Sequence, residues 1–235
     1  MLAIYKREMR AYFTGVIGYV FLVLYLAVGG AAFCLTTLYA MTADVTTFFL
    51  CMLIFSAVML PLLTMKSFSE ERKIRTEQLL LTSPVSITGI VIGKFLAAYT
   101  MFFGCMVVNT LYFFLLQPYA YVKYTILFGN LLAMLLCGLA FIAIGLFVSA
   151  LTENQLAAAV GTIAIIGAFL LIGIIASFIP SSYPIRSIFN FLSIFTRFQG
   201  FTSGYFDIAS LVYYVSLAVI FLYLTVRVYD RRRAG

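Results

Sequence analysis

The chain has 235 residues, of which 64% are hydrophobic and only 10% are charged, and its formal net charge is +7. Soluble domains are about 45–50% apolar and about 25% charged, so the composition excludes a water-soluble fold and predicts one membrane domain over residues 1–235. The positive charges lie at the ends of apolar stretches, which indicates orientation in a membrane and gives no reason to expect nucleic acid as a partner.

Residues 1–15 have the pattern of a helix that lies in the membrane interface. The apolar and aromatic set on one side is Leu2, Tyr5, Met9, Tyr12 and Phe13, and the cationic set on the other is Lys6, Arg7 and Arg10. Such a helix turns its cations toward anionic headgroups. An ordinary positively charged flank of the first membrane span is the alternative.

Six continuous apolar stretches are long enough to cross about 30 Å of hydrocarbon as helices of about 20 residues. The predicted spans run from about Val16 to Tyr39, Thr47 to Met65, Ile90 to Leu116, Tyr124 to Leu151, Leu156 to Ile179 and Ile208 to Val228. Continuous apolar runs favour helices over the alternating strands of a β-barrel. The predicted fold class is therefore an all-α membrane protein with six transmembrane helices.

The basic residues are divided unevenly between the two sides of these spans. Of the 15 Lys and Arg residues, Lys123, Arg186 and Arg197 lie on one side and the other 12 lie on the side of the N-terminus. The positive-inside rule therefore predicts that both termini are cytoplasmic, in a multi-pass protein of the plasma (inner) membrane.

The most highly charged connection joins spans two and three on the predicted cytoplasmic side, over residues 66–84. Ser69 can cap a helix whose first turn contains Glu70 and Glu71, and Glu71 precedes Arg75 in the favourable i, i+4 order. A charged helix pressed against the inner face can transmit force from a soluble partner. The alternative is a solvated connector whose charges only set the topology.

A second, much shorter cytoplasmic turn joins spans four and five. Glu153 is its only charged residue, and Thr152 and Asn154 can cap span five. This turn is a candidate for a second contact with a partner.

Span five carries small residues at a spacing that permits close helix approach. They are Ala157, Gly161, Ala164 and Ala168. This face can form a seam between two copies of the membrane subunit, or it can pack within one subunit.

Residues 180–207, between spans five and six, differ from the other connections. Pro180 and Pro184 bracket a turn, and the following residues combine Phe with polar side chains. Because aromatic rings prefer the membrane interface, we predict short helices at or dipping into the outer interface. A lipid-facing anchor without a functional role is the alternative.

The sequence contains no histidine, which argues against most zinc hydrolases, histidine-based proton relays and histidine-ligated haem. We expect Cys34, Cys51, Cys105 and Cys137 to be small buried hydrophobes and not metal ligands. We also expect no charged residue deep in the spans, although proton- and sodium-coupled carriers usually keep one there. The chain is thus predicted to have no catalytic residue, metal or cofactor, and to take energy from another subunit.

Several motifs resemble those of one transporter family over nearly the whole chain. They are KREMRAYF at Lys6–Phe13, LTMKSFSEERKIRTEQLLLTSPVS at Leu63–Ser86, GKFLA at Gly93–Ala97, LFVSALTENQ at Leu146–Gln155 and FDIASLVYYVSLAVIFLYLT at Phe206–Thr225. In these motifs the chain resembles the membrane subunit (permease) of type-two ABC exporters, especially the small permeases grouped with the gliding-motility-associated ABC permease.

The resemblance implies a coupling helix over Ser69–Leu81 that seats in a separate ABC ATPase subunit, which binds ATP and Mg. The implied contact residues are Ser69, Glu70, Glu71, Arg72, Arg75, Thr76 and Glu77, with Glu153 and Asn154 as a smaller second contact. Two permeases, as a homodimer or heterodimer, would assemble with two ATPases. A face of span two or span five, for which Ala157, Gly161, Ala164 and Ala168 are candidates, would line the route, and the outer short helices would cap it.

Three functions remain in competition at this point. The first is a permease that couples ATP hydrolysis by its partner to export of a substrate. The second is a non-transporting membrane anchor that transmits ATPase-driven motion to an extracytoplasmic assembly or auxiliary subunit. The third, an intramembrane enzyme, is disfavoured because the spans offer Ser, Thr, Tyr and Cys without a convincing base.

Overall fold

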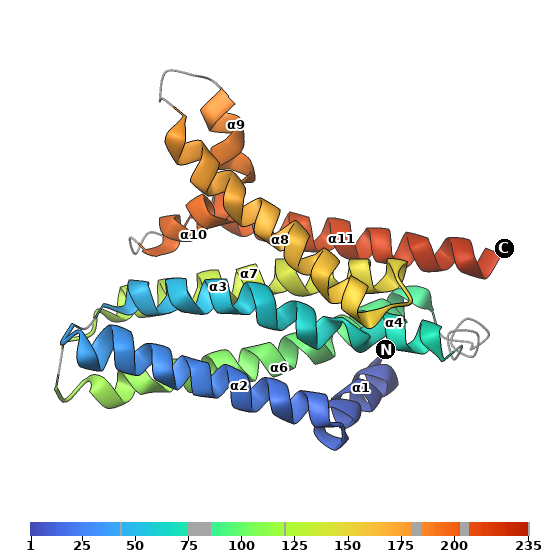
Figure 1. Ribbon diagram of the computed structural model, residues 1–235, viewed down its shortest axis with the longest axis horizontal. Coiled ribbons are helices and arrows are strands. Elements are labelled where there is room, and N and C mark those ends of the chain that lie inside the picture. Colours follow the sequence, from blue (N-terminus) through green and yellow to red (C-terminus); the bar gives the residue numbers. More distant parts are fainter. Residues whose placement is uncertain (43, 75–85, 120, 180–184, 203–206, 235) are drawn as a thin grey trace.

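The computed structural model describes residues 1–42, 44–74, 86–119, 121–179, 185–202 and 207–234, and this part of the chain is helical, with no strands (Figure 1). The elements are α1 (Leu2–Thr14), α2 (Val16–Phe33), the π-helical segment η1 (Cys34–Tyr39), α3 (Val45–Thr64), α4 (Lys66–Lys73), α6 (Ile87–Leu116), α7 (Tyr124–Leu151), α8 (Gln155–Phe178), α9 (Ile185–Leu192), α10 (Ile194–Thr202) and α11 (Ile208–Ala234). The predicted all-α class is confirmed.

Six helical segments among the described residues are long and apolar enough to cross a membrane. They are Val16–Tyr39, Val45–Lys73, Ile87–Leu116, Tyr124–Leu151, Gln155–Ala176 and Ile208–Arg233. The six predicted spans are therefore confirmed, and their ends differ by only a few residues except after span two, where α4 follows α3 with only Met65 between them.

Helix α7 is the central helix of the bundle. It packs against α3, α6, α8 and α11, and 72% of its most apolar window is buried, compared with 22% for α2 and 28% for α8 and α11. Aromatic rings fill the core around it, including Phe102, Phe113 and Phe141, none of which is exposed. The outer helices α2, α8 and α11 therefore carry most of the surface that meets lipid or another subunit.

A glycine lets α6 and α7 approach closely in this core. A Cβ atom at Gly138 of α7 would lie 2.1 Å from Cε1 of the buried Phe102 ring. We expect Gly138→Ala to lower the free energy of unfolding by about 1–3 kcal/mol, because a methyl group forced into a packed core displaces its neighbours. Thermal unfolding in detergent measures this. The matched control is Gly104→Ala, where no heavy atom lies within 4 Å; equal effects of the two substitutions would contradict the packing.

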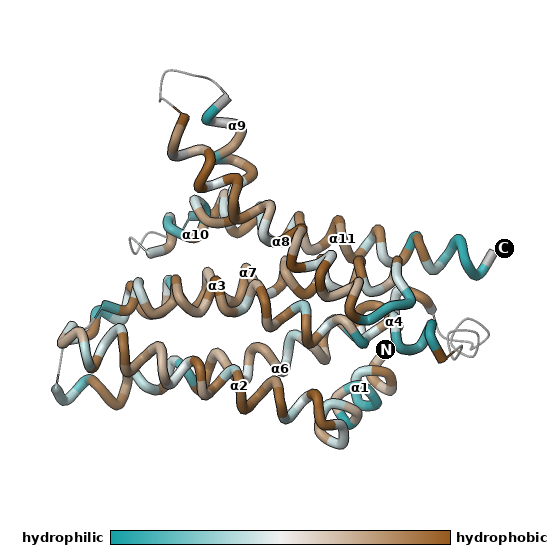
Figure 2. Tube along the Cα trace, viewed as in Figure 1, coloured by the Kyte–Doolittle hydropathy of each residue, from teal (hydrophilic) through white to brown (hydrophobic). Residues whose placement is uncertain are grey.

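The two ends of the bundle differ in character. One end, at the right of Figure 1, carries α1, α4, the α7–α8 turn and the C-terminal part of α11, and the α2–α3 and α6–α7 connections lie at the opposite end. Figure 2 shows hydrophilic residues gathered on α1, α4 and the end of α11, while hydrophobic residues cover the spanning helices. We call the first of these the α4 end.

The predicted segment of short helices consists of α9 and α10. Helix α8 leans away from the bundle and packs against α9, with which it forms a projecting hairpin (Figure 1). Tyr213 and Tyr214 of α11 hold this region by donating hydrogen bonds to the carbonyls of Leu192 (2.6 Å) and Ile194 (2.8 Å). The short helices are therefore fixed to the bundle. The length of α8 separates them from α4.

Helix α1 forms over the predicted segment, and the residue that it buries lies outside the predicted apolar set. Leu2 and Phe13 are exposed, whereas Ile4 is buried, because Gly93 of α6 has no side chain and leaves room for it. Tyr5 also points to α6 and donates a hydrogen bond to Thr100 (3.2 Å). Helix α1 thus packs on α2 and α6.

Candidate functional site

The site is built around α4, an eight-residue helix that follows α3 directly. Its inner side is formed by Ser67, Phe68 and Ser69, which are buried, and the side chain of Glu70 on the other side is 45% exposed. Lys73 and Ile74 at its C-terminal end are exposed as well. Arg72 and Lys73 in the last turn match the negative end of the helix dipole.

A single hydroxyl of α7 holds the start of α4. Ser149 Oγ accepts hydrogen bonds from the backbone N–H groups of Phe68 and Ser69, each at 3.1 Å, and donates one to the carbonyl of Met65 (3.0 Å). These groups lie where α3 gives way to α4, so they need partners from outside the helix. Ser149 therefore fixes α4 to the central helix of the bundle.

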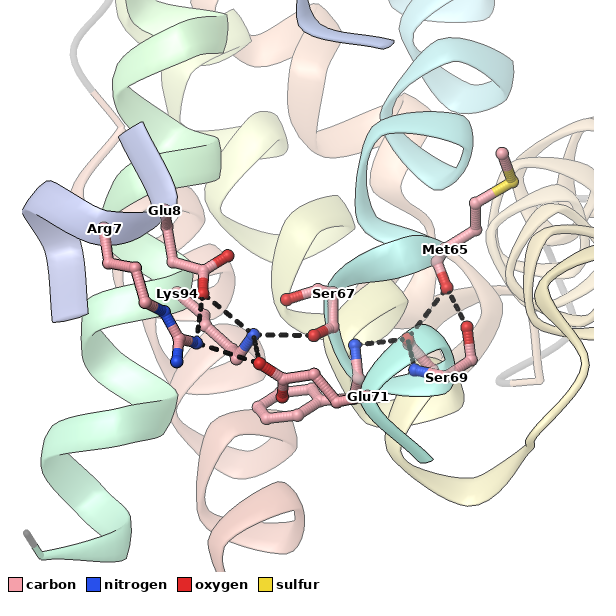
Figure 3. A network of polar contacts seen from close by, with 9 residues as sticks. Arg7, Glu8, Met65, Ser67, Ser69, Glu71 and Lys94 are labelled. Carbon is pink, nitrogen blue, oxygen red and sulfur yellow. Dashed lines mark hydrogen bonds and ion pairs between the residues drawn. The ribbon is translucent and has the colours of Figure 1, made fainter. Parts of the chain in front are cut away.

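A buried lysine joins three helices at the α4 end (Figure 3). Nζ of Lys94 on α6 lies 3.1 Å from Glu8 Oε1 on α1, 2.9 Å from Glu71 Oε1 on α4 and 2.7 Å from the carbonyl of Ser67. Only 2% of the Lys94 side chain is exposed. The ammonium group also lies 5.1 Å from the centre of the Phe68 ring. A buried charge is stable only when paired, and here three acceptors surround it.

Arg7 completes the charge balance of this group. Its guanidinium group lies 2.6 Å from Glu8 Oε1 and 2.9 Å from Glu71 Oε1. Two cations thus face two carboxylates, and the set is neutral. We call Arg7, Glu8, Ser67, Glu71 and Lys94 the Lys94 cluster.

The cluster keeps Glu8 ionised. Burial raises the pKa of Glu8, but attraction to Lys94 and the hydrogen bonds from Arg7 and Lys94 outweigh burial and hold this pKa below its ordinary value of 4.5. A lowered pKa means that the contribution of Glu8 to stability is present above the ordinary value and is lost as the pH falls through the lowered one. Glu8 is therefore ionised at neutral pH.

The α7–α8 turn is fixed to α4 by one arginine. Arg72 donates a hydrogen bond to the carbonyl of Leu151 (2.9 Å) and pairs with Glu153 at 3.0 Å. Asn154 caps α8, since its Oδ1 accepts a hydrogen bond from the N–H of Leu156 (3.0 Å), as predicted. Glu153 remains 64% exposed, so the two charged connections form one continuous surface.

The C-terminal helix closes the remaining side of α4. The rings of Tyr229 on α11 and Phe68 on α4 lie 4.9 Å apart. Arg232 donates a hydrogen bond to the carbonyl of Ala150 (2.8 Å). Helix α4 is therefore held by α6, α7 and α11 and, through the Lys94 cluster, by α1.

The predicted contact residues on α4 separate into inward and outward groups. Ser69 is fully buried and bonds back to the Met65 carbonyl, and Glu71 turns toward Lys94. Glu70 and Glu153 are exposed, and Arg72 lies between the two connections. Three other predicted contacts, Arg75, Thr76 and Glu77, lie outside the described residues, as does the predicted helix from residue 75 onward.

Two expectations about this region are wrong. Ser69 does not cap a helix, because α4 begins at Lys66 and Ser69 lies inside it; Ser149 supplies the partners instead. Thr152 does not cap α8, because its hydroxyl donates to the carbonyl of Val148 (3.3 Å). In both cases the local pattern fitted a cap, but Ser149 of α7 holds the start of α4 and Asn154 caps α8.

One basic residue within α6 is buried at the α4 end of the bundle. Lys94 lies inside α6, well past its first residue, and is fully enclosed. The pairing of Lys94 with Glu8 could have been predicted from sequence, because a charge within an apolar stretch must be paired. Glu8 is the single acidic residue of the N-terminal segment, residues 1–15. The partnership with Glu71 required the fold.

The small residues on the predicted face of α8 differ in exposure. Ala157, Ala164 and Ala168 are exposed, and the position of a Cβ on Gly161 would lie 3.2 Å from Val148 of α7. Packing within this chain therefore involves Gly161 and leaves the three alanines open on the surface.

Comparison with known proteins gives one finding. A family model described as "ABC-2 family transporter protein" matches residues 2–233. A search of curated proteins finds no match to the chain. The matched range contains the Lys94 cluster, α4 and the α7–α8 turn.

Proposed function

Because the chain belongs to the ABC-2 family of transporter proteins and is thus the membrane permease component and not the ATPase, we propose that it serves an ATP-driven exporter. In this proposal a separate ATP-binding subunit supplies the energy, and the α4 end of the bundle receives it. That end would face the cytoplasm, with both termini, as the distribution of basic residues predicts.

The observation that carries the proposal is how α4 is held. It is a short charged helix fixed to the bundle by Ser149 and the Lys94 cluster, yet its Glu70 side chain is half-exposed and Lys73, Ile74 and Glu153 are exposed. A partner that pushes on these side chains would move the helices of the bundle, because packed elements shift as rigid bodies. The inward residues Ser69 and Glu71 would position α4, and the outward residues would contact the ATPase.

A transporter of this kind needs two permeases. The exposed Ala157, Ala164 and Ala168 on α8 support a seam with a second permease, as a homodimer or a heterodimer, since small residues allow close helix approach in lipid. ATP and Mg would be bound by the partner subunit. The alternative is a membrane anchor that passes ATPase motion to an extracytoplasmic assembly, which the resemblance to gliding-motility-associated permeases permits.

Purification of the tagged chain from its native membrane tests the proposal. We expect an ABC ATPase to copurify, and the reconstituted complex to move a substrate across vesicles only when ATP is hydrolysed. An ATPase that copurifies but never drives movement of any candidate substrate would favour the anchor. Absence of any ATPase from the native complex would contradict both.

A further inference from the structure

Helix α1 is an arm attached to the bundle beside α4. It packs on α6 through Ile4 and Gly93 and on α2. Helix α1 moves together with α4 only to the extent that side chains connect the two helices. The links between them include the Arg7–Glu71 pair and the bridge from Glu8 through Lys94 to Glu71.

The two links differ in strength. The Arg7 side chain is 51% exposed, and exposed ion pairs contribute little because water screens them and ordering the side chains opposes them. Lys94 is 2% exposed, and its three N–H donors face three acceptors, on α1, α4 and the backbone of Ser67. Separating α1 from α4 would take at least one carboxylate partner from the buried charge of Lys94, which is unfavourable.

We propose that Lys94 is a positioning residue that makes α1 and α4 move as one unit, so that a displacement of α4 carries the N-terminal helix with it. This inference rests on the proposed function, in which the ATPase moves α4. It gives α1 a role beyond that of an interfacial anchor: α1 becomes a second element, next to the first turn of α2, through which motion reaches the spanning helices.

Hydrogen exchange in the permease–ATPase complex tests this. The complex, in lipid nanodiscs, carries an ATPase that binds but does not hydrolyse ATP, and exchange is followed by mass spectrometry for residues 2–14 and 66–73. In the wild type we expect ATP to change exchange in both segments. In Glu8→Gln and Lys94→Met the change in residues 66–73 persists, whereas the change in residues 2–14 falls at least about fivefold, the lower range of typical coupling between sites.

The controls separate positioning from folding. Lys6→Met removes an exposed cation of α1 and should leave both responses as in the wild type. Glu8→Gln keeps the Lys94–Glu71 pair, so it decides the matter even if Lys94→Met does not assemble. An undiminished response of residues 2–14 in Glu8→Gln would overturn the inference alone. Absence of any response in residues 66–73 of the wild type would overturn the proposed function, and the inference with it.

Discussion

Replacing Lys94 with Met is expected to lower the free energy of unfolding by about 3–5 kcal/mol at neutral pH, the usual cost of breaking a buried ion pair by removing one partner. Methionine fills a similar volume but leaves Glu8 and Glu71 near each other with Arg7 as the remaining cation of the cluster. Unfolding in detergent, followed by circular dichroism, measures the loss.

The same variant should reverse the pH dependence of stability. In the wild type the pKa of Glu8 is lowered below 4.5 by Lys94 and Arg7 despite its burial, so acid destabilises the cluster below that value. In Lys94→Met the buried carboxylates repel each other, and uptake of a proton relieves the repulsion. The loss in the free energy of unfolding of Lys94→Met relative to the wild type should therefore be largest at neutral pH and become smaller as the pH falls toward 4.5.

Two further variants make this prediction specific. Lys6→Met removes an exposed lysine of the same helix bundle and should change stability by less than about 0.5 kcal/mol. The triple variant Lys94→Met with Glu8→Gln and Glu71→Gln removes all buried carboxylates of the cluster and should recover most of the loss, because neutral groups of similar shape tolerate burial. A deficit in Lys94→Met that is independent of pH would indicate lost packing and not lost charge pairing.

Reversing the exposed charges beside α4 is expected to weaken binding of the ATPase subunit at least about tenfold, since like charges placed across an interface cost several kcal/mol. The variant is Glu70→Arg with Glu153→Arg. Both side chains are about half exposed or more and make surface pairs with Lys66 and Arg72, so the fold itself should lose little. Binding to the purified ATPase, measured by biolayer interferometry in nanodiscs, gives the change.

The control for this prediction is Asp230→Arg, which reverses one charge, where the double variant reverses two, at an exposed position of α11 at the same end of the bundle. We expect it to bind the ATPase as the wild type does. Equal weakening by both variants would show a general charge effect, and unchanged binding by both would show that the ATPase does not use the α4 surface.

The spans could be predicted from sequence because the length of an apolar run alone determines whether a helix can cross the bilayer. The details at the α4 end could not, because they depend on contacts between segments far apart in the chain. Ser69 is of a residue type that often caps helices, yet Ser149, 80 residues later, holds the start of the helix. Hydrophobic periodicity likewise grouped Leu2 with the other apolar residues of α1, but it could not show that the bare backbone of Gly93 makes room for Ile4.

The Lys94 cluster could likewise be predicted from sequence only in part. A lysine inside an apolar stretch predicts a buried partner, but which carboxylate fills that role depends on how α1 and α4 meet at α6. The sequence predicted Glu70 and Glu71 alike as contact residues, and Glu71 could be assigned inward only once its contact with Lys94 was known.

The most direct measurement of the central claim is photo-cross-linking in the native membrane, with a photoreactive residue placed at Ile74, which is 61% exposed beside α4. We predict a covalent adduct between the chain and an ABC ATPase, and none from the same residue at Tyr119, which is 88% exposed at the opposite end of the bundle. An ATPase adduct from Tyr119, or an adduct of Ile74 with lipid alone, would contradict the account.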